Sequence, residues 1–447
     1  MNTDSDNLME KIQSLAKRRG FVYQGSEIYG GLAGAWDYGP LGVALKNNIK
    51  DSWRKKFVSS RNDMYEVDAA ILMNSKVWET SGHVATFSDP LVECTKCKRR
   101  FRADTLKEKG KCDECGAPVG EPRSFNMMFA TKIGAMEDSA ATVYLRPETA
   151  QGIFVNFKNI MDSFHPKLPF GIAQIGKAFR NEITPRDFIF RVRELEQMEI
   201  EYFVNPEDWK KYFEYLKDEM VDWMGAIGVN VDKVHELEVA KEDLAHYSER
   251  TIDFEFDFPF GRKELYGLAY RTNFDLSKHE EGSKVSLSYQ DEEAKTKFVP
   301  HVIEPSFGVD RTVLALLASA YTEESKTEGT DVDTRVYLKF KPAMAPVICA
   351  VSPLLKNKPE LVEKAKFVFG MLKSEFGRVM WDDNGNIGKR YRRQDEIGTP
   401  WCIVIDFDTL GEGGESMKDT VTVRDRDTGT QTRIAISDLV SKIKEQL

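Results

Sequence analysis

Apolar side chains recur at helical spacing in several stretches of the chain. Leu45, Ile49, Trp53 and Phe57 fall on one stripe behind Pro40, which predicts an amphipathic helix. Residues 205–208 read Asn-Pro-Glu-Asp, a capping residue, a proline and early acids typical of a helix start. Residues 313–321 and 359–376 indicate two more helices. The stripe that follows residue 208 predicts a helix packed on the core through Trp209, Phe213, Leu216, Met220, Trp223 and Ile227.

Short apolar runs predict strands between these helices. They lie at residues 65–73, 170–175, 188–192, 198–203, 252–258 and 264–270. A second set lies at residues 347–351, 401–405, 420–424 and 431–436, and the Asp-Thr-Gly at 427–429 signals a hairpin. Strands alternating with helices over about 100 residues predict a compact α/β domain at the C-terminal end.

The pattern changes in two places. Residues 89–122 have little core periodicity, so we interpret them as an inserted module. Residues 321–335 are acidic, rich in threonine and poor in apolar residues, and they or residues 342–346 predict a domain boundary. The expected organisation is therefore one domain at residues 1–340 and a second at residues 341–447.

Composition narrows the class of protein. The chain has 447 residues, 41% of them hydrophobic and 30% charged, which excludes a mainly disordered or collagen-like chain. No apolar run approaches about 18 residues, and the first 20 residues lack the apolar segment of a secretory signal, so we expect neither a membrane span nor export. The net charge of −9 says little about nucleic acid, because binding depends on local patches. The chain has two basic patches, and an ordinary solvated face explains each of them as well as nucleic-acid binding does. The first patch is Lys389, Arg390, Arg392 and Arg393, and the second is Lys96, Lys98, Arg99, Arg100 and Arg102.

Four cysteines have the spacing of a metal site. Cys94 and Cys97 are separated by two residues, as are Cys112 and Cys115. Each pair can supply two thiolates from one tight turn, and two such turns close a tetrahedron around Zn²⁺. Four protein ligands leave no open position, so we expect a structural zinc; four free thiols are the alternative. The cluster favours a reducing cytoplasm, whereas Cys349 and Cys402 lie in apolar strands and are expected to be buried.

Arginines in two parts of the chain, a predicted hairpin and a predicted helix start, suggest phosphate binding. Residues 179–182 (FRNE) and 190–195 (FRVREL) flank a turn and read as two strands joined by an arginine-rich loop. Guanidinium groups bind phosphate oxygens in pairs, although a surface hairpin with ion pairs has the same pattern. Residues 304–311 (EPSFGVDR) place Arg311 in the first turn of a helix, where a cation does not favour the helix but an anionic ligand would. An ordinary strand–turn–helix is the alternative there.

Together these elements resemble the three motifs of class II aminoacyl-tRNA synthetases. Longer strings narrow the resemblance to glycyl-tRNA synthetases of the homodimeric type, from about residue 21 to the C-terminus. These strings are YGG at 29–31, DYGPLG at 37–42, LKNNIK at 45–50, SGHV at 81–84, LRPETAQG at 145–152 and EQME at 196–199. Residues 393–400 (RQDEIGTP) are similar to part of the family's second domain.

The resemblance implies an α+β fold. Residues 1–340 would form the class II catalytic core, a mixed and mainly antiparallel sheet with helices. Residues 89–122 would be a zinc-ribbon-like insertion within it, and residues 341–447 an α/β anticodon-binding domain. The resemblance also implies a cytoplasmic homodimer.

The implied reaction has two steps. Glycine and ATP give glycyl-adenylate and pyrophosphate, and glycine then passes to the 3′ end of tRNA(Gly). The substrate carboxylate attacks the α-phosphate, so the protein supplies positioning and charge stabilisation rather than a nucleophile. Mg²⁺ is expected with ATP because it neutralises the phosphates.

Residue roles follow from the matched motifs. Arg180 would hold the α-phosphate and the reacting carboxylate, Glu182 would face the adenine amino group, and Arg311 would meet the adenine and the terminal phosphates. These three are the expected catalytic residues. The expected ATP-binding residues are Arg180, Asn181, Glu182, Phe190, Arg191, Val192, Arg193, Glu194, Leu195, Glu264, Leu265, Gly308, Val309, Asp310 and Arg311.

Glycine selection is a separate problem, because glycine has no side chain to contact and every competitor is larger. A pocket can exclude by volume while carboxylates and a hydroxyl bind the ammonium. The alternative for Glu148 and Glu199 is a structural ion pair with nearby arginines. Arg271 is a further candidate. The expected glycine-binding residues are Arg102, Glu148, Leu195, Glu196, Gln197, Met198, Glu199, Glu304, Ser306 and Gly308.

The chain departs from the class-wide pattern at two positions. Leu195 stands where an aromatic ring that stacks on adenine is usual, and Ala70 stands near the place of a proline in the first motif. Two other functions stay open: a synthetase for another small amino acid, and a non-catalytic RNA-binding paralogue. For tRNA binding, we expect salt-sensitive contacts near the anticodon stem from Lys389, Arg390, Arg392 and Arg393.

Overall fold

A seven-stranded sheet organises the larger body of the protein, which a computed structural model describes over residues 3–134, 142–328 and 331–447. Its strand order is β11-β12-β13-β16-β10-β9-β3, and only the pair β3–β9 is parallel. The sheet is therefore mixed and mainly antiparallel, as predicted. Its strands are β3 (Met64–Glu66), β9 (Phe170–Phe179), β10 (Glu194–Val204), β11 (Val234–Glu238), β12 (Arg250–Phe258), β13 (Gly261–Thr272) and β16 (His301–Gly308).

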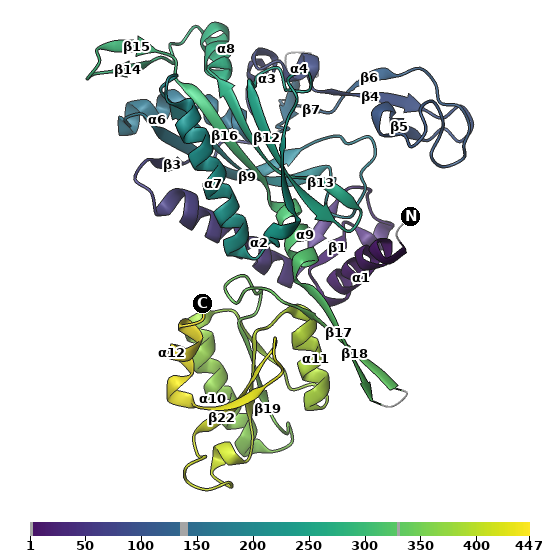
Figure 1. Cartoon of the computed structure of the whole chain (residues 1–447), viewed down its shortest axis with the longest axis vertical. Coiled ribbons are helices and arrows are strands. Elements are labelled where there is room, and N and C mark those ends of the chain that lie inside the picture. The colour runs from purple at the N-terminus through teal and green to yellow at the C-terminus, as the bar shows by residue number, and fades with distance from the viewer. Residues whose placement is uncertain (1–2, 135–141, 329–330) are drawn as a thin grey trace.

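Three helices cover one face of this sheet: α2 (Pro40–Arg54), α7 (Trp209–Ile227) and α9 (Val309–Ala320) (Figure 1). The predicted apolar stripes are the contact surfaces, since Trp53 and Trp223 are almost completely buried. Both rings pack edge-on against Phe307 of β16, at 6.1 and 5.3 Å between ring centroids. Burying this face leaves the opposite face of the strands to carry polar residues.

The opposite face is covered at one end by α5 (Ala150–Phe154), α6 (Phe157–Phe164) and α8 (Phe274–Ser283). Ile153, Phe203 and Leu276 belong to the apolar cluster that joins these helices to the sheet. A small hairpin, β14 (Tyr289–Asp291) with β15 (Thr296–Phe298), extends beyond α8 (Figure 1). The open part of this face lies beside the loop that connects β9 to β10.

The cysteine-containing segment forms a separate three-stranded sheet of order β5-β4-β6, which projects from the body (Figure 1). Its strands are β4 (Ser88–Glu93), β5 (Arg100–Arg102) and β6 (Arg123–Asn126). Val92 and Phe101 pack against Cys94 and Cys112 in a small core of its own. It is flanked in the chain by α3 (Ser75–Thr80), α4 (His83–Thr86), β7 (Phe129–Lys132) and β8 (Thr142–Leu145).

The C-terminal part folds around a five-stranded sheet of order β20-β19-β21-β22-β23. Its first two pairs are parallel and its last two antiparallel, which gives the predicted α/β domain. Cys349 and Cys402 are buried in it as expected. The elements are β19 (Cys349–Pro353), α10 (Pro359–Phe376), β20 (Val379–Trp381), α11 (Ile387–Ile397), β21 (Trp401–Ile405), β22 (Thr420–Asp425), β23 (Gln431–Ala435) and α12 (Leu439–Lys444).

An antiparallel hairpin, β17 (Tyr321–Glu328) with β18 (Asp331–Leu338), runs between the two bodies, and α1 (Thr3–Arg19) lies near its base (Figure 1). Arg335 of β18 donates to Asp395 of α11 at 2.8 Å. Arg18 of α1 donates to Glu396, the next residue of α11, at 3.1 Å. The hairpin and the N-terminal helix therefore both hold α11.

The structure corrects three predicted elements. Residues 65–73 are a strand only through Glu66, because β3 is a short edge strand beside β9. Residues 188–192 are a turn, although Phe188 and Phe190 are buried like strand residues. The helix expected from residue 205 begins at Trp209, and the stretch interpreted as a candidate domain boundary carries the β17–β18 hairpin. Within the described part of the chain, no helix is both long and apolar enough to cross a bilayer.

Candidate active site

The open face of the central sheet carries a row of polar residues from adjacent strands. Glu199 of β10 lies opposite Ser306 of β16, and Ser306 lies opposite Gly267 of β13. Gly267 in turn lies opposite Asp253 of β12. Because side chains alternate between the two faces of a strand, Gln197 and Glu201 share this face with Glu199, and Glu304 shares it with Ser306.

A cavity of about 460 Å³ lies over this row. Most of the residues predicted from the sequence line it, although they come from five separate segments of the chain. Those that line it are Arg102, Glu148, Arg180, Glu182, Phe190, Arg191, Val192, Leu195, Glu196, Gln197, Glu199, Glu264, Leu265, Glu304, Ser306, Gly308, Asp310 and Arg311.

Five predicted residues do not line this cavity. Met198 and Val309 are fully buried in the apolar core on the other face of the sheet. Arg193 donates to the carbonyl oxygens of Ala33 and Glu182 and thereby fixes the loop. The remaining two are Asn181, whose backbone N–H bonds to Met127, and Glu194, which pairs with Lys177 at the surface.

One end of the cavity is acidic. Glu148 accepts from Gln151 at 3.1 Å and lies 3.3 Å from His83. Burial opposes its ionisation, but the neighbouring His83 and Arg271 hold the pKa of Glu148 well below its usual range. Glu148 is therefore a charged carboxylate, and it is held by a histidine and an amide rather than by the arginine pair considered from the sequence.

Glu199 accepts hydrogen bonds from three residues at this end. Its Oε1 accepts from Ser306 at 3.0 Å and from Gln197 at 2.8 Å, and its Oε2 accepts from the backbone and hydroxyl of Thr149. Burial and the charge of Glu148 raise the pKa of Glu199. The side-chain oxygen of Gln197 is buried without a hydrogen-bond partner, so an acceptor in the cavity wall is left for a ligand.

Arg271 holds the acidic end of the cavity in place through buried hydrogen bonds. It donates to both oxygens of Asp275 at 2.8 and 2.9 Å and to Glu304 at 2.9 Å. Its guanidinium also lies 3.8 Å from the ring centroid of Tyr247, another residue of the cavity wall. With these partners Arg271 is almost completely buried, and it orients Glu304 toward the cavity.

The other end of the cavity is cationic. Arg180 donates to the carbonyl of Pro147 at 3.0 Å, and Arg191 lies 3.3 Å from Glu182. Arg311 lies 3.1 Å from the carboxylate of Glu264, and its guanidinium is 4.5 Å from the ring centroid of Phe190. The aromatic surface absent at Leu195 is thus provided by Phe190, a residue of the predicted set that occupies a turn.

Two further lining residues are held by groups from the N-terminal part of the chain. Glu196 lies 2.8 Å from Lys46 and 3.0 Å from Lys50, and Asp310 accepts from the hydroxyl of Tyr38 at 2.5 Å. These contacts attach β2 (Trp36–Tyr38) and α2 to the floor of the site. Arg102 also lines the cavity, and its ion pair with Asp89, 2.9 Å away, lies within the cysteine-containing insertion.

The structure adds acidic residues that sequence reasoning missed. Asp253 lines the cavity, and burial with the charges of Glu264 and Glu255 raises its pKa to about 7. Glu201 lies beneath the acidic end. Asp253 and Glu201 both belong to strands in which polar residues alternate with apolar ones. This alternation was the signal in the sequence that could have identified them. Only the pairing of the strands brings them to this face.

The four cysteines converge as their spacing predicts. The Sγ atoms of Cys94, Cys97, Cys112 and Cys115 all lie within 4.8 Å of one another. A backbone N–H of Cys97 lowers the pKa of Cys94 to about 6, which favours the thiolate form that binds metal. The cluster is compatible with tetrahedral zinc.

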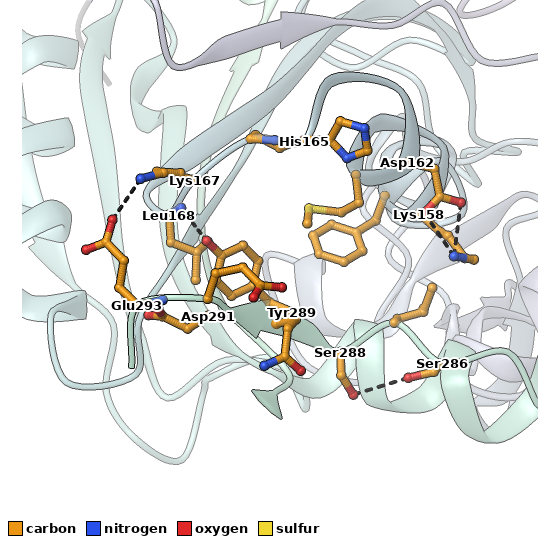
Figure 2. A pocket seen from close by; sticks show the side chains of 16 residues that line it. Lys158, Asp162, His165, Lys167, Leu168, Ser286, Ser288, Tyr289, Asp291 and Glu293 are labelled. Atoms are coloured by element: carbon orange, nitrogen blue, oxygen red, sulfur yellow. Dashed lines mark hydrogen bonds and ion pairs between the residues drawn. The ribbon is translucent and has the colours of Figure 1, made fainter. Parts of the chain in front are cut away.

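A second cavity of similar size, about 470 Å³, lies between α6 and the β14–β15 hairpin (Figure 2). Its charged side chains pair with one another: Lys167 lies 2.7 Å from Glu293, and Lys158 lies 3.0 Å from Asp162. None of the predicted site residues lines it. The convergence of acidic and cationic groups therefore distinguishes the first cavity.

Comparison with known proteins matches both parts of the chain to family models. Residues 131–320 match the tRNA synthetase class II core domain (G, H, P, S and T), and residues 348–446 match an anticodon binding domain. A glycine–tRNA ligase of Acetivibrio thermocellus is 50% identical, over 97% of this chain and 97% of the relative. Similar matches are glycine–tRNA ligases of Ruminiclostridium cellulolyticum, 50% identical over 98% of both chains, and of Treponema denticola, 48% identical over 98% of this chain and 97% of the relative.

The chain belongs to the glycine–tRNA ligase family. The predicted recognition and fold class are thereby confirmed: a class II synthetase core and an anticodon-binding domain in one α+β chain. As a glycine–tRNA ligase family member, the protein is an aminoacyl-tRNA ligase, and the cavity over the sheet lies in its class II core.

Proposed function

We propose that this cavity activates glycine with ATP and that the protein then transfers glycine to tRNA(Gly). The observation that carries this proposal is that one cavity has buried carboxylates at one end and guanidinium groups at the other. An amino acid and a nucleotide could then meet in the middle. Family membership gives the overall activity, and the roles of single residues below are our proposal.

The acidic end fits the ammonium of glycine. Glu148, Glu199 and Glu304 supply negative charge, and the unpartnered oxygen of Gln197 supplies a further acceptor. These groups are held in place by His83, Thr149 and Arg271, so a side chain on the substrate would have to displace a rigid, hydrogen-bonded wall. Selection for glycine would thus come from exclusion of any larger amino acid.

The cationic end fits ATP. Arg311 and Phe190 face each other across 4.5 Å, so an adenine ring would separate them and stack between a ring and a guanidinium. Arg180 would hold the α-phosphate and the attacking carboxylate, and Glu182 would accept from the adenine amino group. In-line attack at the α-phosphate would then require only alignment and neutralisation of charge.

Mg²⁺ would be held near Glu264 and Asp253. The raised pKa of Asp253 reflects a cluster of acids in which a cation would favour the ionised form, so the donor set fits. When bound with ATP, the ion neutralises phosphate charge.

Zinc would be held by Cys94, Cys97, Cys112 and Cys115 and would be structural, because the four thiolates complete its coordination. Such thiolates need a reducing environment, which supports a cytoplasmic location.

We also propose that the division of labour follows the fold. Residues 1–340, with the insertion at 89–122, would carry adenylate formation, and residues 341–447 would bind the anticodon arm. Two apolar clusters support this division, because one is formed mainly by residues up to Val347 and the other by residues 348–443. In the basic patch of α11, Lys389 and Arg392 are exposed, whereas Arg390 is buried and donates to the carbonyls of Pro353 and Gly385. Lys389 and Arg392 are therefore the better candidates for RNA contact.

A homodimer is the proposed assembly. β3 forms an edge of the central sheet, and Phe164, which is 60% exposed, contacts Tyr65 of that strand at 5.1 Å between ring centroids. An exposed aromatic residue beside an open strand edge is a surface that a second copy would cover. The substitution Phe164→Glu should shift sedimentation toward the monomer, whereas Phe367→Glu, at an equally exposed position of α10, should not.

The deciding experiment for the activity is glycine-dependent exchange of pyrophosphate into ATP by the purified protein. Exchange with glycine, and little with alanine or serine, is the expected result. Faster exchange with alanine or serine would indicate a synthetase for another small amino acid. RNA binding without any exchange would indicate the non-catalytic paralogue.

A further inference from the structure

Glu201 has an unusual environment. It is fully buried, and neither of its carboxyl oxygens has a hydrogen-bond partner. It shares the cavity-facing side of β10 with Glu199. The strand pairs Glu199–Ser306 and Tyr202–Ile303 place it directly across from Glu304 on the neighbouring strand.

Most of the charged groups around Glu201 disfavour a charge on it. Three of its neighbours are acids: Glu199 on the same strand, Glu304 on β16 and Asp275 on α8. The cation in this set is Arg271 of β13, and its hydrogen bonds go to Asp275 and Glu304. Helix α5, which covers this part of β10, contains no charged residue.

An ionised carboxylate in this position would be buried without a donor and among like charges, which is strongly unfavourable. A protonated carboxyl avoids the charge and becomes a hydrogen-bond donor. Burial and the charge of Glu304 accordingly raise the pKa of Glu201 well above its usual range.

We propose that Glu201 is an uncharged positioning residue of the glycine site, which carries a proton and donates it in a hydrogen bond toward Glu304. Glu304 is then held from two sides, by Arg271 and by Glu201, with its remaining acceptor capacity directed at the substrate ammonium. The inference rests on the proposed glycine site, and it adds a residue that does not line the cavity.

The test uses two variants of similar size. Glu201→Gln is uncharged and still donates, whereas Glu201→Met is uncharged and cannot donate. In ATP–pyrophosphate exchange at pH 8.5, where Glu304 is mostly ionised, Glu201→Gln should keep the glycine KM within about three-fold of the wild type. Glu201→Met should raise the glycine KM about ten-fold or more, the usual effect of losing a hydrogen bond to a charged group, while the ATP KM stays unchanged.

A spectroscopic measurement covers the case in which Glu201→Met fails to fold. The infrared difference spectrum of wild type minus Glu201→Gln at neutral pH should contain the C=O stretch of a protonated carboxyl. Three results would overturn the proposal. The first is a carboxylate band in place of the C=O stretch. The second is a rise in the glycine KM of Glu201→Gln as large as that of Glu201→Met, and the third is an unchanged glycine KM in a folded Glu201→Met. Wild-type exchange with glycine tests the proposed function separately, because the infrared band does not depend on turnover.

Discussion

Arg180 connects two segments that meet only in the folded protein. It follows β9 in the chain, and its Nε donates to the carbonyl of Pro147 in the segment that also carries Glu148. The side chain also lies 5.5 Å from the ring centroid of Phe87. These contacts leave its guanidinium at the cavity wall with its direction fixed, which is the arrangement needed to align a phosphate.

Arg180→Ala should lower the rate of glycyl-adenylate formation by about two orders of magnitude or more, because a charge that stabilises the transition state is removed. The matched control is Arg186→Ala, in the same loop but outside the cavity, with its side chain 3.5 Å from Asp187. Pyrophosphate exchange measures the rate, and circular dichroism checks the fold. Near-normal exchange in Arg180→Ala would refute the role given to this motif.

The acidic end should also make glycine binding depend on pH. Burial raises the pKa of Glu304 to about 8; Arg271 opposes this shift, and Glu199 and Glu148 add to it. Below pH 8 the carboxyl is mostly protonated and binds an ammonium poorly, so the glycine KM should fall about eight-fold between pH 7 and pH 8.5. The ATP KM measured over the same interval is the control. A glycine KM that is constant or rises over this interval would contradict the prediction.

At the scale of elements, the cysteine-containing insertion couples a metal site to the cavity. Its β5 ends at Arg102, which lies 2.9 Å from Asp89 at the start of β4 and lines the cavity. The small core of this insertion has few apolar residues, so folding of the strands is expected to depend on the metal.

Cys97→Ser should therefore reduce bound zinc from about one ion per chain to almost none and expose the insertion to protease. Metal analysis and limited trypsin digestion measure the two effects. Cys349→Ala, a cysteine substitution in the C-terminal sheet, should retain the zinc. Zinc-free wild-type protein, purified without chelators, would remove the basis of the prediction.

At the scale of the whole molecule, α11 is where the catalytic body holds the C-terminal domain. Arg335 of the hairpin donates to Asp395, which also accepts from Arg424 of β22 at 2.8 and 3.0 Å. The side chain of Asp395 is only 3% exposed, so this contact is shielded from solvent. A tRNA bound by both domains depends on their relative position, and this contact helps to fix it.

Arg335→Met should leave pyrophosphate exchange unchanged and lower the kcat/KM of tRNA charging about five-fold, because it leaves a buried carboxylate with one partner fewer. Lys11→Ala is the control, since its ion pair with Glu323 joins α1 to the same hairpin at the surface and such pairs contribute little. Equal losses in exchange and in charging would instead indicate damage to the catalytic body.

Much of the fold was predictable because it depends on local periodicity. The helix α10 was predicted with its observed bounds, and β21 likewise, since each buries one regular apolar face or a whole apolar run. Prediction failed for residues 188–192 because a buried turn has the same apolar residues as a strand. The strands of the β17–β18 hairpin were not predicted, because their polar and acidic sequence lacks the apolar signal of a buried strand.

The sequence by itself determined the family, the zinc-type cysteine spacing and most of the cavity residues, because strings and spacings are properties of the chain. Only the tertiary structure decided which side chains act together. It placed Phe190 over Arg311, buried Arg390 away from solvent and brought Glu201 and Asp253 to the cavity side of the sheet. The physical reason is strand pairing: which residues become neighbours is set by the register between distant segments, and local sequence does not encode that register.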